Sequence, residues 1–203
     1  MKIFCIGRNY ADHAKELGNG VPDEPIIFMK PKSALVQGHT PFYYPEFTND
    51  LHYEGELVVR ISKNGKYIQE KHASNYYNSI SVGIDFTARD IQTHLKENGL
   101  PWEKAKSFDN SAAVGKFIDL TPAIDKKNIN FSLNKNKEVV QSANSKSMIF
   151  SIDRIISNIS NYFSLNIGDL IYTGTPVGVG ECMVGDVLEG YLEKELVLTL
   201  EIK

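Results

Sequence analysis

Short hydrophobic runs separated by polar turns dominate this chain. The strand-like runs occupy residues 2–6, 26–30, 55–61, 79–86, 167–173 and 195–202. Apolar runs of this length, bounded by turn residues, are typical of β-strands. The run that ends at Ile61 is followed by the turn-forming residues 63–66, which predicts a β-hairpin. Beyond residue 114 strand-like runs again alternate with polar turns, so β-structure is expected to prevail.

Three segments have the pattern of helices. Asn9 can cap a short helix that ends before Gly18, since asparagine favours the residue before a helix and glycine the residue after it. Thr87 and Asp90 resemble a capping box that opens a helix to about Glu97, and residues 153–163 form an amphipathic candidate helix. Helices do not alternate regularly with strands, so we predict an α+β fold, predominantly β, in one domain over residues 1–203.

Composition narrows the classes of protein. The 22 basic and 25 acidic residues are mixed along the chain and leave a net charge of -3, without the basic stripe that a nucleic-acid backbone demands. Cys5 and Cys182 are far apart and form no CxxC motif, so no thiolate metal site is indicated. No apolar run approaches the length of a membrane span or of a signal peptide. We expect a cytoplasmic protein with no nucleic-acid or membrane partner.

Three carboxylates suggest a metal site. Glu54 and Glu56 are two residues apart in a strand-like run, so they share a face of that strand. Asp85 follows a buried strand at its junction with a helix. Hard divalent cations such as Mg²⁺ or Mn²⁺ take such oxygen ligands. The alternative is that the two glutamates line a solvated hairpin face and that Asp85 is an ordinary residue before a helix.

Other polar residues could complete an active site. His13 and Glu16 lie three apart on the first helix, where a carboxylate can orient an imidazole that acts as general base; a surface pair is the alternative. The glycine-rich segment 173–180 could present N–H groups to an anion, but it has neither a P-loop nor a GxGxxG motif. Four further residues could bind a carboxylate or simply be solvated: Lys30, Arg89, Gln92 and Lys106.

In this order the motifs resemble the fumarylacetoacetate hydrolase family, and most of all its acylpyruvase and oxaloacetate decarboxylase members. The segments that carry the resemblance are 7–13 (GRNYADH), 28–31 (FMKP), 53–57 (YEGEL), 83–90 (GIDFTARD), 101–106 (PWEKAK) and 168–176 (GDLIYTGTP). One departure is Tyr53, which replaces the second histidine of the His-His-Glu-x-Glu found in many members. The metal-binding carboxylates are retained.

The resemblance implies a mixed β-sandwich roll, of the type of the family's C-terminal domain, and a homodimer. It implies that Glu54, Glu56 and Asp85 hold Mg²⁺ or Mn²⁺. Catalysis would use His13, Glu16 and Lys106, with Lys106 near the cation. The residues implied in binding the substrate are Arg8, Lys30, Arg89, Gln92 and the backbone at Thr175.

The activity implied is cleavage of a C–C bond in a small 2-oxo acid, through a pyruvate enolate that the cation stabilises. In acylpyruvate hydrolysis, His13 supported by Glu16 would activate a water molecule, whereas oxaloacetate decarboxylation needs no attacking water. The alternative within the family is an isomerase, tautomerase or decarboxylase of hydroxymuconate-type 2-oxo dioic acids, or an oxaloacetate tautomerase. A remoter alternative is a binding protein that kept the fold but lost the chemistry.

Overall fold

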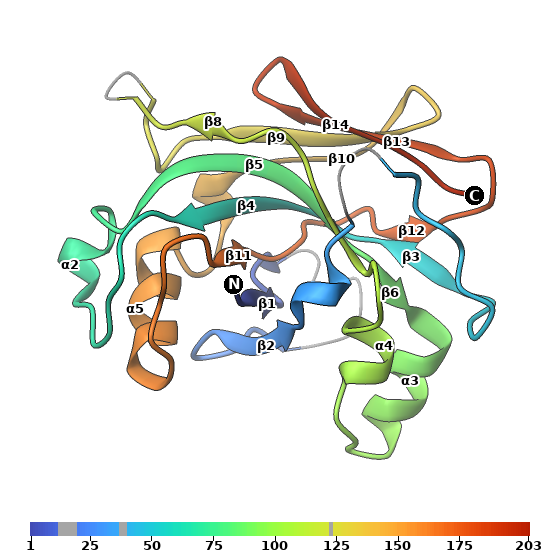
Figure 1. Ribbon diagram of the computed structural model, residues 1–203, viewed down its shortest axis with the longest axis horizontal. Helices are drawn as coiled ribbons and strands as arrows, with labels where there is room; N and C mark the ends of the chain where they lie inside the picture. Colours follow the sequence, from blue (N-terminus) through green and yellow to red (C-terminus); the bar gives the residue numbers. More distant parts are fainter. Residues whose placement is uncertain (12–19, 37–39, 122–123) are drawn as a thin grey trace.

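Two curved β-sheets packed face to face form the body of the molecule (Figure 1). The computed structural model describes residues 1–11, 20–36, 40–121 and 124–203. The larger sheet has the order β2 (Ile26–Lys30), β1 (Ile3–Gly7), β11 (Leu170–Tyr172), β4 (Gly55–Ile61), β5 (Tyr77–Asp85) and β7 (Ala112–Val114), with β8 (Ile118–Asp119) also pairing with β5. It is mixed, because β1 and β11 run parallel and its other pairs run antiparallel.

The second sheet is antiparallel and covers one face of the first. Its order is β10 (Glu138–Asn144), β9 (Asn130–Lys135), β13 (Val187–Leu192) and β14 (Glu195–Glu201). A small third sheet joins β12 (Gly180–Glu181), β3 (Leu51–Tyr53) and β6 (Thr87–Ala88). The predicted α+β fold with a mostly β, sandwich-like architecture is confirmed.

Strands β4 and β5 are buried on both faces, which explains why they read as nearly continuous apolar runs. Leu57 and Val82 belong to the core between the two large sheets, together with Phe131 of β9. Val58, next to Leu57, points to the opposite face and packs in a separate cluster with Tyr172. The layers meet closely, because a Cβ built at Gly190 would lie 2.9 Å from Val82. The sandwich therefore holds β4 and β5 rigidly at its centre.

Helices close the two ends of the sandwich (Figure 1). At one end α2 (Glu70–Ala73) packs against α5 (Ile152–Tyr162), whose N-terminus is capped by the side chain of Ser151. At the other end lie α3 (Arg89–Glu97) and α4 (Glu103–Lys106). Two 3₁₀ turns complete the elements: η1 (Lys32–Ala34) and η2 (Ser145–Ser147). The end with α3 and α4 is the one that carries the candidate site.

Local predictions were accurate for several elements and wrong for two connections. Strands β2 and β4 have the predicted bounds, and α5 is displaced by one residue from its prediction. Strands β4 and β5 pair as predicted. The connection between them is residues 62–76, a segment that includes α2, and not a tight turn. The capping box is also wrong: Thr87 pairs with β3 as part of β6, and Ala88 precedes α3 without a side-chain cap. Pairing with a distant strand outweighs the local capping preference.

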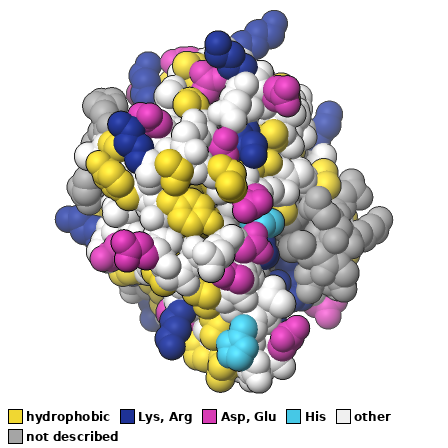
Figure 2. Space-filling model, turned by 90° about the vertical axis from the view of Figure 1, so that its right-hand side faces the viewer, with side chains coloured by type: hydrophobic (Ala, Val, Ile, Leu, Met, Phe, Trp, Pro, Cys, Tyr) yellow, Lys and Arg dark blue, Asp and Glu magenta, His cyan; other side chains and the backbone are white. Residues whose placement is uncertain are grey.

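The surface and the cysteines complete the description. On the face shown in Figure 2, acidic and basic side chains are interspersed instead of gathered by sign. Cys5 and Cys182 are both buried, with free thiols. Among the helices that the structure describes, none has the length and apolar character that a membrane crossing requires. The first predicted helix, with His13 and Glu16, lies outside the described residues.

Candidate active site

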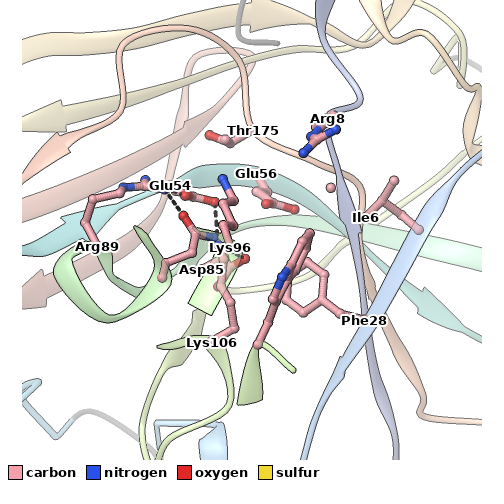
Figure 3. Close-up of a pocket in the computed structure, with 13 residues that line it drawn as sticks. Ile6, Arg8, Phe28, Glu54, Glu56, Asp85, Arg89, Lys96, Lys106 and Thr175 are labelled. Atoms are coloured by element: carbon pink, nitrogen blue, oxygen red, sulfur yellow. Dashed lines mark hydrogen bonds and ion pairs between the residues drawn. The ribbon is translucent and has the colours of Figure 1, made fainter. Parts of the chain in front are cut away.

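Three carboxylates converge where β4 begins and β5 ends (Figure 3). Glu54 directly precedes β4, Glu56 is its second residue, and Asp85 is the last residue of β5. In the antiparallel pair the amide of Asp85 donates to the carbonyl of Glu54 at 2.8 Å, so the two residues meet across the strands. Because residues two apart on a strand share a face, Glu56 joins them. One ligand oxygen from each residue lies within 4.8 Å of the others.

This carboxylate triad is buried. Glu54, Glu56 and Asp85 are 6%, 2% and 1% exposed, and buried like charges repel each other strongly. Burial, followed by the charges of Asp85 and Glu54, raises the pKa of Glu56 well above the usual range of a glutamate. Lys30 Nζ forms an ion pair with Asp85 Oδ1 at 2.7 Å, whereas Glu56 has no ion pair with any of the described residues. A divalent cation among these oxygens would relieve the remaining repulsion.

Lys106 contacts two members of the triad at once. Its Nζ, at the end of α4, lies 2.7 Å from Glu54 Oε2 and 2.9 Å from Asp85 Oδ2. It also donates to Thr87 Oγ1 at 2.6 Å. Burial alone would lower the pKa of Lys106, but the carboxylates of Asp85 and Glu54 outweigh burial and raise that pKa. The ammonium therefore stays protonated at the centre of the site.

Lys30 stands behind Asp85 and is not part of the pocket wall. Lys30 is 2% exposed, and its ammonium donates to both the carbonyl and the hydroxyl oxygen of Ser111, at 2.9 and 3.0 Å. It also donates to the carbonyl oxygen of Lys106. With its donors engaged by the protein, Lys30 is placed to orient Asp85 and Lys106. Its predicted role in binding the substrate stays a prediction.

One face of α3 presents three polar residues to the pocket. Arg89, Gln92 and Lys96 are spaced by three and four residues, so they lie on one side of the helix, and all three line the pocket. Arg89 Nη2 lies 2.6 Å from Glu54 Oε1, and its Nη1 donates to Gln92 Oε1 at 2.6 Å. Gln92 thereby orients the guanidinium that neutralises Glu54.

The glycine-rich loop after β11 holds the triad from the opposite side. The amide of Gly174 donates to Glu56 Oε2 at 2.7 Å, so the anion that this loop binds in the structure is a protein carboxylate. Gly174 has φ +99, and a Cβ there would lie 2.6 Å from Cβ of Asn9, which only glycine avoids. The hydroxyl of Thr175 donates to the carbonyl of Gly55 at 2.9 Å. Gln141 Nε2 donates to the Thr175 hydroxyl at 2.9 Å.

The rest of the pocket combines an apolar wall with a further cation. Ile6, Phe28 and Trp102 line one side, and Phe28 and Trp102 pack edge to face with ring centroids 5.9 Å apart. Arg8, with φ 59, and Thr175 also line the pocket. The predicted pair His13 and Glu16 lies outside the residues that the structure describes. Their roles remain predictions.

The sequence reasoning missed three residues of this region. Lys96 carries a signal that could have been used, because it lies seven residues after Arg89 and therefore on the same helix face. Trp102 belongs to the motif at residues 101–106, but the resemblance gave this residue no role. Gln141, which is 2% exposed, lies in a polar strand segment with no local pattern that indicates burial.

These features define an enzyme site of a known class. A sequence model of the fumarylacetoacetate (FAA) hydrolase C-terminal family matches residues 2–201, and the chain belongs to that family, as the resemblance indicated. It is therefore an enzyme of the FAA hydrolase family.

Individual relatives narrow the comparison. The chain is 40% identical to oxaloacetate tautomerase FAHD1 of Mus musculus over 201 residues, which cover 99% of this chain and 91% of the relative. It is 40% identical to the mitochondrial oxaloacetate decarboxylase of Dictyostelium discoideum, over 93% of this chain and 87% of the relative. The structure is also similar to a crystal structure of fumarylpyruvate hydrolase from Pseudomonas aeruginosa in complex with Mn²⁺ and pyruvate. The two superpose with a TM-score of 0.93 at 35% identity, over 100% of this chain and 89% of that one.

Proposed function

We propose that this protein is a Mg²⁺- or Mn²⁺-dependent enzyme that cleaves a C–C bond in small 2-oxo acids, by hydrolysis of acylpyruvates and decarboxylation of oxaloacetate. The observation that carries the proposal is the buried carboxylate triad of Glu54, Glu56 and Asp85, whose ligand oxygens converge on one point of the pocket. The names of the relatives, which include an oxaloacetate decarboxylase and a fumarylpyruvate hydrolase, support these substrates.

The donor set fits a hard divalent cation. Three carboxylates with ligand atoms within 4.8 Å of one another match the oxygen ligands that Mg²⁺ and Mn²⁺ take, and we assign all three as the ligands. When bound, such a cation supplies Lewis-acid polarisation of a substrate's carbonyl oxygen. The Mn²⁺ in the structure of the P. aeruginosa relative supports the proposal for this chain.

Charge favours an anionic substrate. Lys30, Lys106 and Arg89 are in ion pairs with the triad, so its three negative charges are already balanced by protein cations. A divalent cation would leave the pocket positive, which favours a carboxylate-bearing ligand. Arg8 adds to that positive charge from the pocket wall. The apolar side chains opposite would limit the entry of water.

Lys106 holds a proton where the reaction needs one. Its protonated Nζ donates to Glu54, Asp85 and Thr87. Once a cation binds the two carboxylates, one of these donors can turn to an oxygen on which negative charge develops beside the triad. Tautomerisation of oxaloacetate is the second candidate function, because it requires only a proton transfer between carbon and oxygen. The name of the mouse relative and the place of Lys106 favour it.

The test is turnover by purified protein stripped with EDTA, with and without added Mg²⁺ or Mn²⁺. Acetylpyruvate and oxaloacetate are the substrates, and both enol absorbance and pyruvate release are followed. Metal-dependent pyruvate release is expected. Enol loss without pyruvate would favour the tautomerase, and the absence of any metal-dependent change would refute both candidates.

His13→Ala separates the two cleavage reactions. If His13 activates a water molecule, the variant loses kcat/KM for acetylpyruvate hydrolysis by about 100-fold or more, while metal-dependent oxaloacetate decarboxylation changes little. Equal losses for both substrates would contradict this role.

A further inference from the structure

One of the three acceptors of the Lys106 ammonium differs in kind from the other two. Two are carboxylates of the triad, Glu54 and Asp85, at 2.7 and 2.9 Å from Nζ (Figure 3). The third is the neutral hydroxyl of Thr87, whose Oγ1 lies 2.6 Å from Nζ. Thr87 and Lys106 are both buried. The bond to Thr87 is the shortest of the three, and it alone among them is made to a residue outside the triad.

The fold fixes the direction in which the Thr87 hydroxyl points. Asp85 ends β5 and Thr87 begins β6, two residues later, and both side chains contact Lys106, as expected for residues two apart in extended backbone. Thr87 pairs with His52 of β3, and its β-branched side chain has few rotamers. Its own hydroxyl proton is directed to the Asp85 carbonyl, at 3.4 Å. A lone pair of Oγ1 is thereby left to face the ammonium.

The bond to Thr87 does not depend on the charge of the triad. Glu54 and Asp85 are assigned as ligands, so their oxygens would be shared with a divalent cation, and a divalent cation and an ammonium repel each other. Thr87 is uncharged and does not belong to the ligand set, so its bond to Lys106 can persist in the metal-loaded enzyme. The ring of Phe28, whose centroid lies 5.4 Å from Nζ, is a weaker and less directional contact.

We infer that Thr87 is a positioning residue, which holds the Lys106 ammonium beside the triad when the carboxylates are engaged by the metal ion. This inference rests on the proposed function, in which Lys106 donates to an oxygen on which negative charge develops. Thr87 acts only through Lys106. With one N–H held by Thr87, the ammonium keeps its place, and a remaining N–H is available to the reacting oxygen.

Kinetics of Thr87→Val test this role, because valine removes the acceptor and keeps the shape of the side chain. In the Mg²⁺-loaded enzyme kcat for oxaloacetate, followed as pyruvate release and as enol loss, is expected to fall about 10- to 100-fold, the range for groups that orient an active-site ligand. KM should change little, since Thr87 does not line the pocket. Thr87→Ser keeps the hydroxyl and should restore most of kcat.

The ammonium can also be observed directly, without turnover. In protein labelled with ¹⁵N-lysine, the signal of the Lys106 ammonium is identified by its absence in Lys106→Arg. In the metal-free protein the signal should survive in both the wild type and Thr87→Val, because Glu54 and Asp85 still accept from Nζ. After Mg²⁺ is added it should survive in the wild type and in Thr87→Ser. In Thr87→Val it should broaden or vanish, because the released ammonium exchanges its protons with water.

Ser160→Ala is the matched control. The Ser160 hydroxyl is also buried and accepts a hydrogen bond, from the Ile68 amide at 2.8 Å. It lies on α5, at the opposite end of the molecule (Figure 1). The variant should lower the urea midpoint, as Thr87→Val does, because a buried partner is lost in each case. It should change neither kcat nor the Lys106 signal.

The outcomes separate this inference from the proposed function. If the wild type neither binds Mg²⁺ nor shows Mg²⁺-dependent turnover, the proposed function fails and the inference fails with it. If the wild type is active but Thr87→Val keeps its kcat, or keeps its Lys106 signal with Mg²⁺, the role of Thr87 is refuted while the proposed function stands. The same follows if Thr87→Ser is as impaired as Thr87→Val, because the loss then comes from packing, or if KM or Mg²⁺ affinity changes in place of kcat.

Discussion

Gln141 is the residue whose removal most directly tests how the fold supports the site. Its Oε1 accepts from the amide of Gly55 at 2.8 Å, and its Nε2 donates to the Thr175 hydroxyl and to the Pro176 carbonyl, each at 2.9 Å. Gly55 lies between the ligands Glu54 and Glu56. A single buried side chain on β10 thus joins the ligand strand to the loop that holds Glu56. We predict that Gln141→Leu weakens both the fold and the metal site.

The size of the effect follows from the groups left behind. The variant leaves two buried backbone groups, the Gly55 amide and the Pro176 carbonyl, without these partners, and each costs about 1–3 kcal/mol. The leucine offsets about 1 kcal/mol through apolar burial. A net loss of about 3 kcal/mol in the free energy of unfolding corresponds to a Tm lower by about 6–12 °C in a domain of this size. Misplacing the carboxylates is expected to weaken Mn²⁺ binding by about 10-fold or more, as for other residues that orient metal ligands.

Urea unfolding of the metal-free protein and isothermal titration calorimetry with Mn²⁺ measure the two effects separately. Gln141→Glu keeps an acceptor for the Gly55 amide but places an unpaired carboxylate in a buried position against the Pro176 carbonyl, so a loss of stability at least as large as that of Gln141→Leu is expected at pH 7. Ser142→Ala, at the exposed neighbouring position on β10, is the matched control and should change neither quantity. An unchanged urea midpoint and an unchanged Mn²⁺ affinity in Gln141→Leu would refute the reasoning.

Three further predictions address the triad and the fold. Asp85→Asn should abolish Mn²⁺ binding in calorimetry with a native circular dichroism spectrum, and wild-type affinity would place the cation elsewhere. Lys106→Met removes one of the two cations that pair with each of Glu54 and Asp85, so the metal-free protein should lose about 3 kcal/mol, the lower end of the cost of breaking a buried ion pair. Thermal melts should show that Mn²⁺ stabilises this variant more than the wild type, and equal gains would contradict the assigned charge role. Burial would raise the pKa of Asp186, but hydrogen bonds from the Met183 amide and the Asn136 side chain, with the charge of Lys135, lower it. The unfolded chain then binds more protons than the native one as the pH falls. Asp186→Asn should therefore be less stable than the wild type at pH 7, and the difference in stability should shrink in acid. A difference in urea midpoints that stays constant with pH would contradict this.

The local part of the site could be predicted from the sequence. The period of two in a strand depends only on the backbone of neighbouring residues, so it was enough to place Glu54 and Glu56 on one face. The helical period likewise placed Arg89 and Gln92 together, and it would have added Lys96 had it been extended by one turn. The importance of Lys106 came from the resemblance, because nothing in its immediate neighbours distinguishes it from a solvated lysine.

Contacts between distant segments were decided by the tertiary structure. Asp85 meets Glu54 because β4 and β5 pair in one particular antiparallel register, and a shift of one residue would have turned the carboxylate to the other face. Lys30 lies behind Asp85, and Gln141 reaches Gly55 from another sheet, through contacts that no local pattern encodes. Thr87 likewise belongs to β6 and does not cap the following helix, because it pairs with β3, a strand far away in the sequence. The sequence by itself therefore determined which side chains share a face of an element, because backbone geometry is local. Only the packing of the two sheets decided which faces meet, because that depends on the burial of residues far apart in the chain.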